Sequence, residues 1–71
     1  MTRYANLSGR SNVYAYEIGS TYIDVEFRDG SVYRYSYASA GSYNVEKMKD
    51  LAEQGYGLNS YIMYNCKYDY E

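Results

Sequence analysis

Apolar and polar side chains alternate with a period of two along most of residues 13–37, and this alternation constrains the fold more than any other feature. A period of two is typical of β-strands that bury one face. Two short turn signals, Gly19-Ser20 and Asp29-Gly30, interrupt it. The pattern therefore predicts an antiparallel β-meander of three strands, over residues 13–18, 22–27 and 32–37.

The length of the turn that contains Gly30 decides which face of the sheet Tyr33 takes. A two-residue turn would place Tyr33 opposite Glu26, on the charged face. A three-residue turn places it opposite Val25 and puts Gly30 at the left-handed position of a type I turn with a G1 bulge. A shift of one residue reverses every side chain of a strand. We choose the three-residue turn, because it brings Tyr33 and Tyr35 onto the apolar face.

These registers divide the side chains of the predicted meander between a covered and an open face. A two-residue turn at Gly19-Ser20 would pair Tyr16 with Ile23. The predicted structural core on the covered face comprises Tyr14, Tyr16, Ile23, Val25, Phe27, Tyr33 and Tyr35, with Ile18 beside them. The open face mixes charged and apolar side chains, and its predicted interaction surface comprises Val13, Tyr22, Val32 and Arg34.

The periodicity changes to that of an α-helix after the third predicted strand. Val45, Met48 and Leu51 recur at helical spacing with charged residues between them, which indicates an amphipathic helix. Asn44 is a suitable N-cap for it and Gly55 a suitable terminator, while the short segment before Asn44 is expected to be a loop. We expect the helix to lie across the covered face and to add Met48 and Leu51 to the core.

The segment after Gly57 leaves two structures open. Asn59 would cap a second short helix, whose inner side would carry Leu58, Ile62 and Cys66. A short strand over the same residues is the alternative. The predicted fold class is therefore α+β: a three-stranded antiparallel β-meander, one amphipathic helix packed on it, and a short C-terminal helix or strand that places Ile62 in the core.

The chain is short for a stable fold. Its 71 residues suffice for one domain, which we place at residues 11–71 after a loose segment of residues 1–10. Small domains usually need disulfides, a metal or oligomerisation. There is no histidine and Cys66 is the only cysteine, so we expect no internal disulfide, no metal site and no cofactor. The 13 tyrosines can supplement the core, because each ring buries apolar area while its hydroxyl stays hydrogen-bonded.

Charge and hydropathy patterning narrow the possible functions and locations. The formal net charge of −2 argues against a non-specific nucleic-acid binder, whose affinity depends on many basic residues. It leaves room for a local basic patch or a small anionic ligand. Residues 1–10 carry no apolar stretch of signal-peptide length, and no segment is long enough to span a membrane. With a single cysteine, this predicts a cytoplasmic protein without membrane association.

One set of residues matches a known family. The set comprises Ser11, the alternation Ile23, Val25 and Phe27, then Gly30, Tyr33 and Tyr35, the spacing of Asn59 and Ile62, and Lys67 with Tyr68. In this order the chain resembles, from residue 11 to residue 68, the KTSC domain. That module occurs at the end of some lysyl-tRNA synthetases and as stand-alone bacterial and phage proteins. The resemblance implies a bacterial cell or a phage-infected host, and RNA binding as a role. Where the family places a proline before its helix, this chain has Ala38.

A polar cluster near the C-terminal end is the predicted ligand-binding site. It comprises Gly55, Gly57, Asn59, Tyr61 and Lys67. The glycines leave backbone N–H groups free, and a helix beginning at Asn59 would attract an anion. This pattern predicts binding of RNA or of a nucleotide-type anionic ligand. The alternative is that Asn59 only caps the helix and holds no ligand.

Two further residue groups carry alternatives. Tyr33 and Tyr35 belong to the core in the chosen register, although rings on an open sheet would stack nucleobases, and buried rings with hydroxyls at the rim are an intermediate outcome. Arg34 lies level with Asp24 and Glu26, so we expect a cross-strand ion pair there, with a phosphate contact as the other possibility.

No residue pattern pairs a nucleophile with a general base, since Cys66 and the serines have no histidine partner. We therefore expect a non-enzymatic binding module. The alternative to RNA or nucleotide binding is a phage or bacterial protein-interaction module that inhibits a host defence protein stoichiometrically. A third hypothesis joins the two, in which a homo-oligomer sequesters a nucleotide signal between its subunits.

Overall fold

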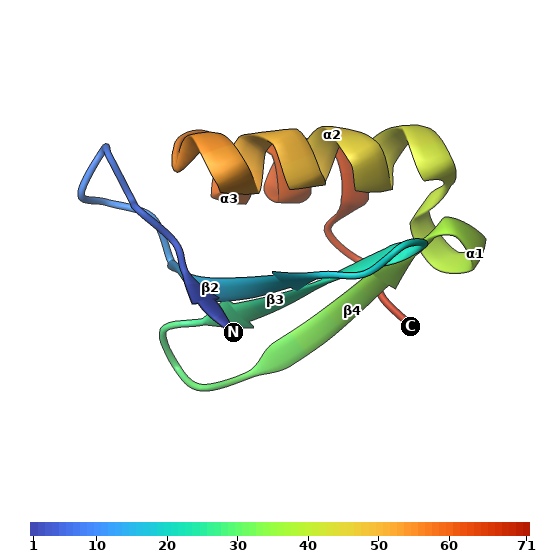
Figure 1. Ribbon diagram of the computed structural model, residues 1–71, viewed down its shortest axis with the longest axis horizontal. Coiled ribbons are helices and arrows are strands. Elements are labelled where there is room, and N and C mark those ends of the chain that lie inside the picture. Colours follow the sequence, from blue (N-terminus) through green and yellow to red (C-terminus); the bar gives the residue numbers. More distant parts are fainter.

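The predicted strands form one antiparallel sheet, which lies beneath a layer of helices in the computed structural model of residues 1–71 (Figure 1). β2 (Val13–Ile18), β3 (Tyr22–Phe27) and β4 (Val32–Ser36) form the predicted meander. A fourth strand, β1 (Thr2–Arg3), pairs with the free edge of β2, so the order is β1-β2-β3-β4. The α+β class is confirmed, whereas the expectation of three strands is wrong.

The helical part of the chain follows the sheet. It consists of α1 (Tyr37–Ala40), α2 (Ser42–Gln54), α3 (Leu58–Tyr61) and the π-helical turn η1 (Ile62–Cys66). The long helix α2 crosses one face of the sheet, and α3 and η1 run back beside it on the same side (Figure 1). Of the two structures left open for the C-terminal segment, the helix is therefore correct. None of these helices has the length and apolar character that a bilayer crossing requires.

The turn between β3 and β4 has the predicted three-residue form. Val25 pairs with Tyr33, and Ile23 pairs with Tyr35. Gly30 has a φ of 92°, a backbone conformation that L side chains rarely adopt. Because this glycine fixes the turn and the turn fixes the register, both tyrosines lie on the apolar face. The predicted register of this hairpin is confirmed.

The register of β2 differs from the prediction by two residues and by a bulge. Tyr16 pairs with Val25, because the turn residues are Ser20-Thr21 and not the preceding pair. A β-bulge at Tyr14 then interrupts the pairing. As a result Val13 faces the core and is 1% exposed, while Tyr14 faces outward and is 41% exposed. The expectations that Tyr14 is a core residue and that Val13 lies on the open face are both wrong.

The core lies between the sheet and α2. Its buried side chains are Tyr4, Val13, Ile23, Val25, Tyr35, Val45, Met48, Ala52, Leu58, Ile62 and Cys66. Three predicted core residues, Tyr16, Phe27 and Leu51, pack against this cluster and remain partly exposed. Tyr33 lies on the same face of the sheet but is 37% exposed, so it stands at the rim of the core.

Glycines set both ends of α2. Gly41 is its N-cap, and Asn44, which was expected to be the cap, lies within the first turn and donates its side-chain amide to the Ala40 carbonyl at 2.9 Å. The helix ends as predicted at Gly55, whose φ of 76° is left-handed. The expected loop before α2 contains the short helix α1, because Ser36 caps that turn through a reciprocal pair of hydrogen bonds with Ser39.

The first residues of the chain contribute to the core, although residues 1–10 were expected to form a loose segment. Tyr4 is 3% exposed, and its hydroxyl accepts a hydrogen bond from the Leu58 N–H at 3.3 Å. The Leu7 N–H donates to the Gly55 carbonyl at 2.8 Å. The segment before β2 therefore joins the sheet to the point where α2 ends and α3 begins.

Candidate functional site

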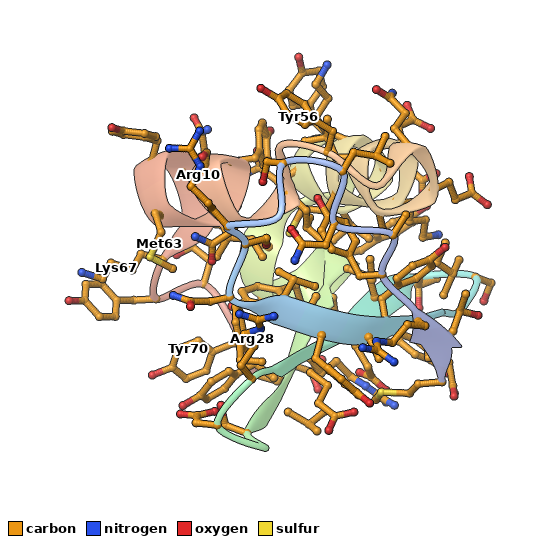
Figure 2. All side chains as sticks on the ribbon, turned by 90° about the vertical axis from the view of Figure 1, so that its left-hand side faces the viewer. Arg10, Arg28, Tyr56, Met63, Lys67 and Tyr70 are labelled. Atoms are coloured by element: carbon orange, nitrogen blue, oxygen red, sulfur yellow. The ribbon has the colours of Figure 1, made fainter.

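The largest cleft lies where the β3–β4 turn approaches the C-terminal segment. Its volume is about 480 Å³. Five aromatic side chains line it, namely Phe27, Tyr33, Tyr35, Tyr68 and Tyr70. The remaining lining residues are Asn12, Arg28, Asp29, Ser31, Met63 and Lys67. We call this site the aromatic cleft. Figure 2 looks at the side of the molecule that carries Arg28, Met63, Lys67 and Tyr70.

The rings of the aromatic cleft contact one another in a row. Phe27 and Tyr33 meet edge to face, with ring centroids 5.9 Å apart. Tyr70 lies against Tyr33 at 4.6 Å and presents its edge to Tyr35 at 6.3 Å. The chain end is held there because the Glu71 N–H donates to the Arg34 carbonyl of β4 at 2.8 Å. The tail thus forms one wall of the cleft and β4 the other.

Tyr35 differs from the other rings because its side chain is almost fully enclosed. It is 1% exposed and lines the aromatic cleft. No buried side-chain oxygen or nitrogen lacks a partner, yet the Tyr35 hydroxyl makes no hydrogen bond within the protein. The accessible remnant of Tyr35 therefore includes its hydroxyl. Burial raises the pKa of this tyrosine to about 12, so a neutral hydroxyl is presented at the floor of the cleft.

Two cations and one carboxylate stand at the mouth of the aromatic cleft. Neither Arg28 nor Lys67 forms an ion pair, since the only such pairs are Arg34–Asp24 and Lys49–Glu46. The Asp29 carboxylate accepts hydrogen bonds from the N–H and hydroxyl of Ser31, at 2.9 and 2.6 Å. These bonds hold the pKa of Asp29 below its usual value. The carboxylate is therefore ionised but already occupied, while the two cations are free.

A second, more polar cleft lies on the same side of the molecule. Its volume is about 390 Å³, and its lining residues are Ser8, Arg10, Ser11, Tyr56, Gly57, Asn59 and Ser60. We call it the serine cleft. Figure 2 shows Arg10 above Met63 and Lys67, with Arg28 below them and Tyr56 at the upper end. The three unpaired cations Arg10, Lys67 and Arg28 thus share one face.

The comparisons with known proteins leave this geometry without a precedent. No family model matches the chain, and neither a curated protein nor a solved structure matches it. The resemblance to the KTSC domain stays a prediction. The function must therefore be argued from the two clefts and the side chains around them.

The structure divides the predicted ligand-binding residues among different surroundings. Gly57 and Asn59 line the serine cleft, while Lys67 lines the aromatic cleft. The Tyr61 hydroxyl donates to the Asn44 side-chain oxygen at 2.6 Å, which ties η1 and α3 to α2. Gly55 is buried against the first segment of the chain. These residues do not form one pocket.

The backbone feature on which the predicted anion site depended is also different. The N-cap of α3 is Gly57, not Asn59, and the helix has only four residues before it widens into η1. The Leu58 N–H, which the prediction left free, is bonded to the Tyr4 hydroxyl. The positive charge available to a ligand therefore comes from side chains.

The open face of the sheet has fewer contact residues than predicted. The Arg34 guanidinium lies 3.9 Å from the centre of the Tyr22 ring and forms the expected ion pair with Asp24, at 2.8 Å. Val32 is half exposed, while Val13 belongs to the core. Only Val32 among these residues offers a free apolar surface.

Sequence reasoning missed several residues that shape the aromatic cleft. Arg28 was assigned to the predicted turn without a role, and Tyr70 was given none. The three-residue turn implied that Arg28 stands next to Tyr33 in space, so this residue had a usable signal. Tyr70 had no such signal, because its position depends on the return of the tail to β4.

The groups around the aromatic cleft suit stacking, hydrogen bonding and charge pairing. Burial raises the pKa of the Cys66 thiol to about 11, so the sulfur is protonated at neutral pH. Ring faces attract planar ligands and free guanidinium or ammonium groups attract anions. A ligand that combines a planar ring with a negative charge would use both kinds of group at once.

Proposed function

We propose that this protein is a small non-enzymatic binding module for a nucleotide-type anionic ligand, which it holds in the aromatic cleft. The observation that carries the proposal is the combination of five lining rings with two unpaired cations, Arg28 and Lys67. Aromatic side chains stack on nucleobases without regard to sequence, and basic side chains pair with phosphate. The two kinds of group lie within one cleft.

The dimensions of the cleft support a small ligand. A volume of about 480 Å³ falls within the range of typical ligand pockets, roughly 300–1,000 Å³. The exposed part of Tyr33 offers a ring face at the rim, and the Tyr35 hydroxyl offers a hydrogen bond at the floor. A base would stack against Tyr33 and direct a polar edge toward Tyr35, while its phosphate stays near the cations at the mouth.

The resemblance to the KTSC domain supports the same location. Of the residues that carry it, Tyr33, Tyr35, Lys67 and Tyr68 all line the aromatic cleft. Gly30 lies in the turn that borders it. The role suggested for that family, RNA binding, belongs to the same class of ligand chemistry.

A thermal-shift screen of nucleotides, followed by calorimetry, tests the proposal. At a concentration of about one hundred times Kd, a ligand stabilises the folded state by about 2.7 kcal/mol, which raises Tm by roughly 10 °C or more in a domain of this size. Lys67→Ala and Arg28→Ala should each weaken binding by about tenfold or more, because each removes a charge-assisted contact. Lys47→Ala is the matched control, since Lys47 is exposed on α2 and lies outside both clefts.

Two results would count against the proposal. One is the absence of any shift with adenosine, guanosine, cytidine and uridine phosphates. The other is equal weakening by Lys47→Ala and Lys67→Ala, which would place the binding outside the aromatic cleft.

A further inference from the structure

The aromatic cleft and the serine cleft adjoin along two segments of the chain. Ser11 lines the serine cleft, and the next residue, Asn12, lines the aromatic cleft. On the helical side, Ser60 lines the serine cleft, and Met63, three residues later, lines the aromatic cleft. Residues three apart on a helix are neighbours on its surface. The two clefts therefore form one continuous concave face.

This face has a charge opposite in sign to that of the chain. The chain holds 7 basic and 9 acidic residues. Three of the basic residues, Arg10, Arg28 and Lys67, line the two clefts, together with a single acidic residue, Asp29. The face thus gathers a local excess of two positive charges on a protein whose net charge is −2.

The loop that presents Arg10 is held in place from both sides. The Ser11 N–H donates to the Asn6 side-chain oxygen at 3.1 Å, and the Val13 N–H donates to the Ser11 hydroxyl at 3.0 Å. The Arg10 N–H itself donates to the Ser8 hydroxyl at 3.2 Å. The Arg10 side chain makes no ion pair, so its guanidinium is free on a loop whose backbone is fixed.

We propose that the natural ligand is a single-stranded oligonucleotide of at least two nucleotides, whose backbone follows Arg28, Lys67 and Arg10 from the aromatic cleft into the serine cleft. This inference rests on the proposed function and extends it from one nucleotide to a strand. One base stacks in the aromatic cleft on Tyr33, and the strand continues toward Tyr56, which is 61% exposed at the far end of the face (Figure 2). A mononucleotide reaches only the first two cations.

The test compares ligands of increasing length. Adenosine monophosphate and fluorescent ribo-oligonucleotides of two, four and eight adenosines are titrated by calorimetry and fluorescence anisotropy, with deoxyribo-oligonucleotides of the same lengths in parallel. Each additional stacked base should raise affinity by at least about fivefold until the face is filled. Arg10→Ala should weaken binding of the tetranucleotide severalfold and leave binding of the monophosphate unchanged, whereas Arg28→Ala should weaken both.

Salt dependence supplies a second measurement. Three phosphate contacts predict a slope of log K against log salt near −2 for the tetranucleotide, because each contact to a single strand contributes about −0.7. Arg10→Ala should reduce the slope by about 0.7, and Lys47→Ala should leave it unchanged. The ribose and deoxyribose series together show whether the protein distinguishes RNA from single-stranded DNA.

The outcomes separate the two proposals. Equal affinity for the monophosphate and for every oligonucleotide would overturn the strand and retain the nucleotide site. Binding of a tetraglutamate peptide as tightly as the tetranucleotide would also overturn it, because charge alone would then account for the affinity. Absence of binding by any nucleotide or oligonucleotide would overturn both.

Discussion

The contact between Gly55 and Ala5 offers a sharp test of how the first segment of the chain packs on the helices. A Cβ added at Gly55 would lie 2.5 Å from the Ala5 Cβ, far inside van der Waals contact. Gly30 is a natural control, since it also has a positive φ, 92° against 76°, but a Cβ there would meet nothing within 4 Å. The two glycines share the backbone requirement and differ only in the steric one.

The expected magnitudes follow from these two terms. A left-handed backbone costs about 1–2 kcal/mol for a residue with a Cβ, so Gly30→Ala should destabilise the protein by that amount. Gly55→Ala adds an overpacking term of about 1–3 kcal/mol, for a total of roughly 2–5 kcal/mol. Ala5→Gly removes the clashing atom, because the next nearest atom, the Ala5 Cα, lies at 3.5 Å, an ordinary contact distance.

A double-mutant cycle between these positions isolates the packing term. In the Ala5→Gly background, Gly55→Ala should cost only about as much as Gly30→Ala does, which makes the two changes non-additive by about 1–3 kcal/mol. Urea unfolding monitored by tyrosine fluorescence and circular dichroism measures each variant, and Tm should follow by roughly 4–8 °C per kcal/mol. If Gly55→Ala costs no more than Gly30→Ala, or if Ala5→Gly restores nothing, the first segment does not pack on Gly55 as described.

Two further predictions concern the buried tyrosines. Tyr4→Phe should destabilise the fold by about 1–3 kcal/mol in chemical denaturation, because the ring is kept while the buried Leu58 N–H loses its acceptor; no change would mean that this N–H has another partner. Burial raises the pKa of Tyr35 from 10.0 to about 12, so the folded state retains a proton that the unfolded state loses, and this contribution is complete below pH 10 and disappears as the pH rises to about 12. Unfolding measured across that window should show a fall of about 1.4 kcal/mol per pH unit from this group, which Tyr35→Phe removes and the control Tyr64→Phe, at an 88% exposed position, leaves intact.

The β3–β4 hairpin could be predicted because local chemistry and long-range pattern agreed there. Gly30 allows the left-handed turn position, and the resulting register buries Ile23 and Val25. A register shifted by one residue would have buried charged side chains, so the pattern rejected it. The long helix was predictable for the same reason, since its apolar spacing and Gly55 indicated the same end point.

The register of β2 could not be obtained from the pattern. A shift of two residues keeps every side chain on its face, so alternation does not distinguish the turn at Ser20-Thr21 from the one predicted. Gly19 was assigned to the turn, but its role is steric, because a Cβ there would lie 2.1 Å from the Tyr22 ring. The bulge at Tyr14 leaves no periodic mark either.

The candidate site was predictable in part. The turn and the pair Tyr33 and Tyr35 came from the sequence, as did Lys67 as a free cation. The site also needs the tail, which returns to β4 and places Tyr70 against Tyr33. Such a return is a contact between segments far apart in the sequence, and neither periodicity nor a cap reports it. The predicted cluster around Gly57 failed as one site because its members belong to elements that face different ways.

The hydroxyls of the buried tyrosines link the stability of this fold to its proposed binding. A short chain without disulfides gains apolar area from tyrosine rings, but each enclosed hydroxyl then needs a hydrogen bond. Of the two tyrosines in the core, Tyr4 finds its partner at the start of α3, whereas Tyr35 finds none within the protein and reaches the aromatic cleft. A ligand that bonds this hydroxyl satisfies a group that folding leaves exposed to solvent. Tyr35 is therefore the residue at which the core and the ligand are expected to meet.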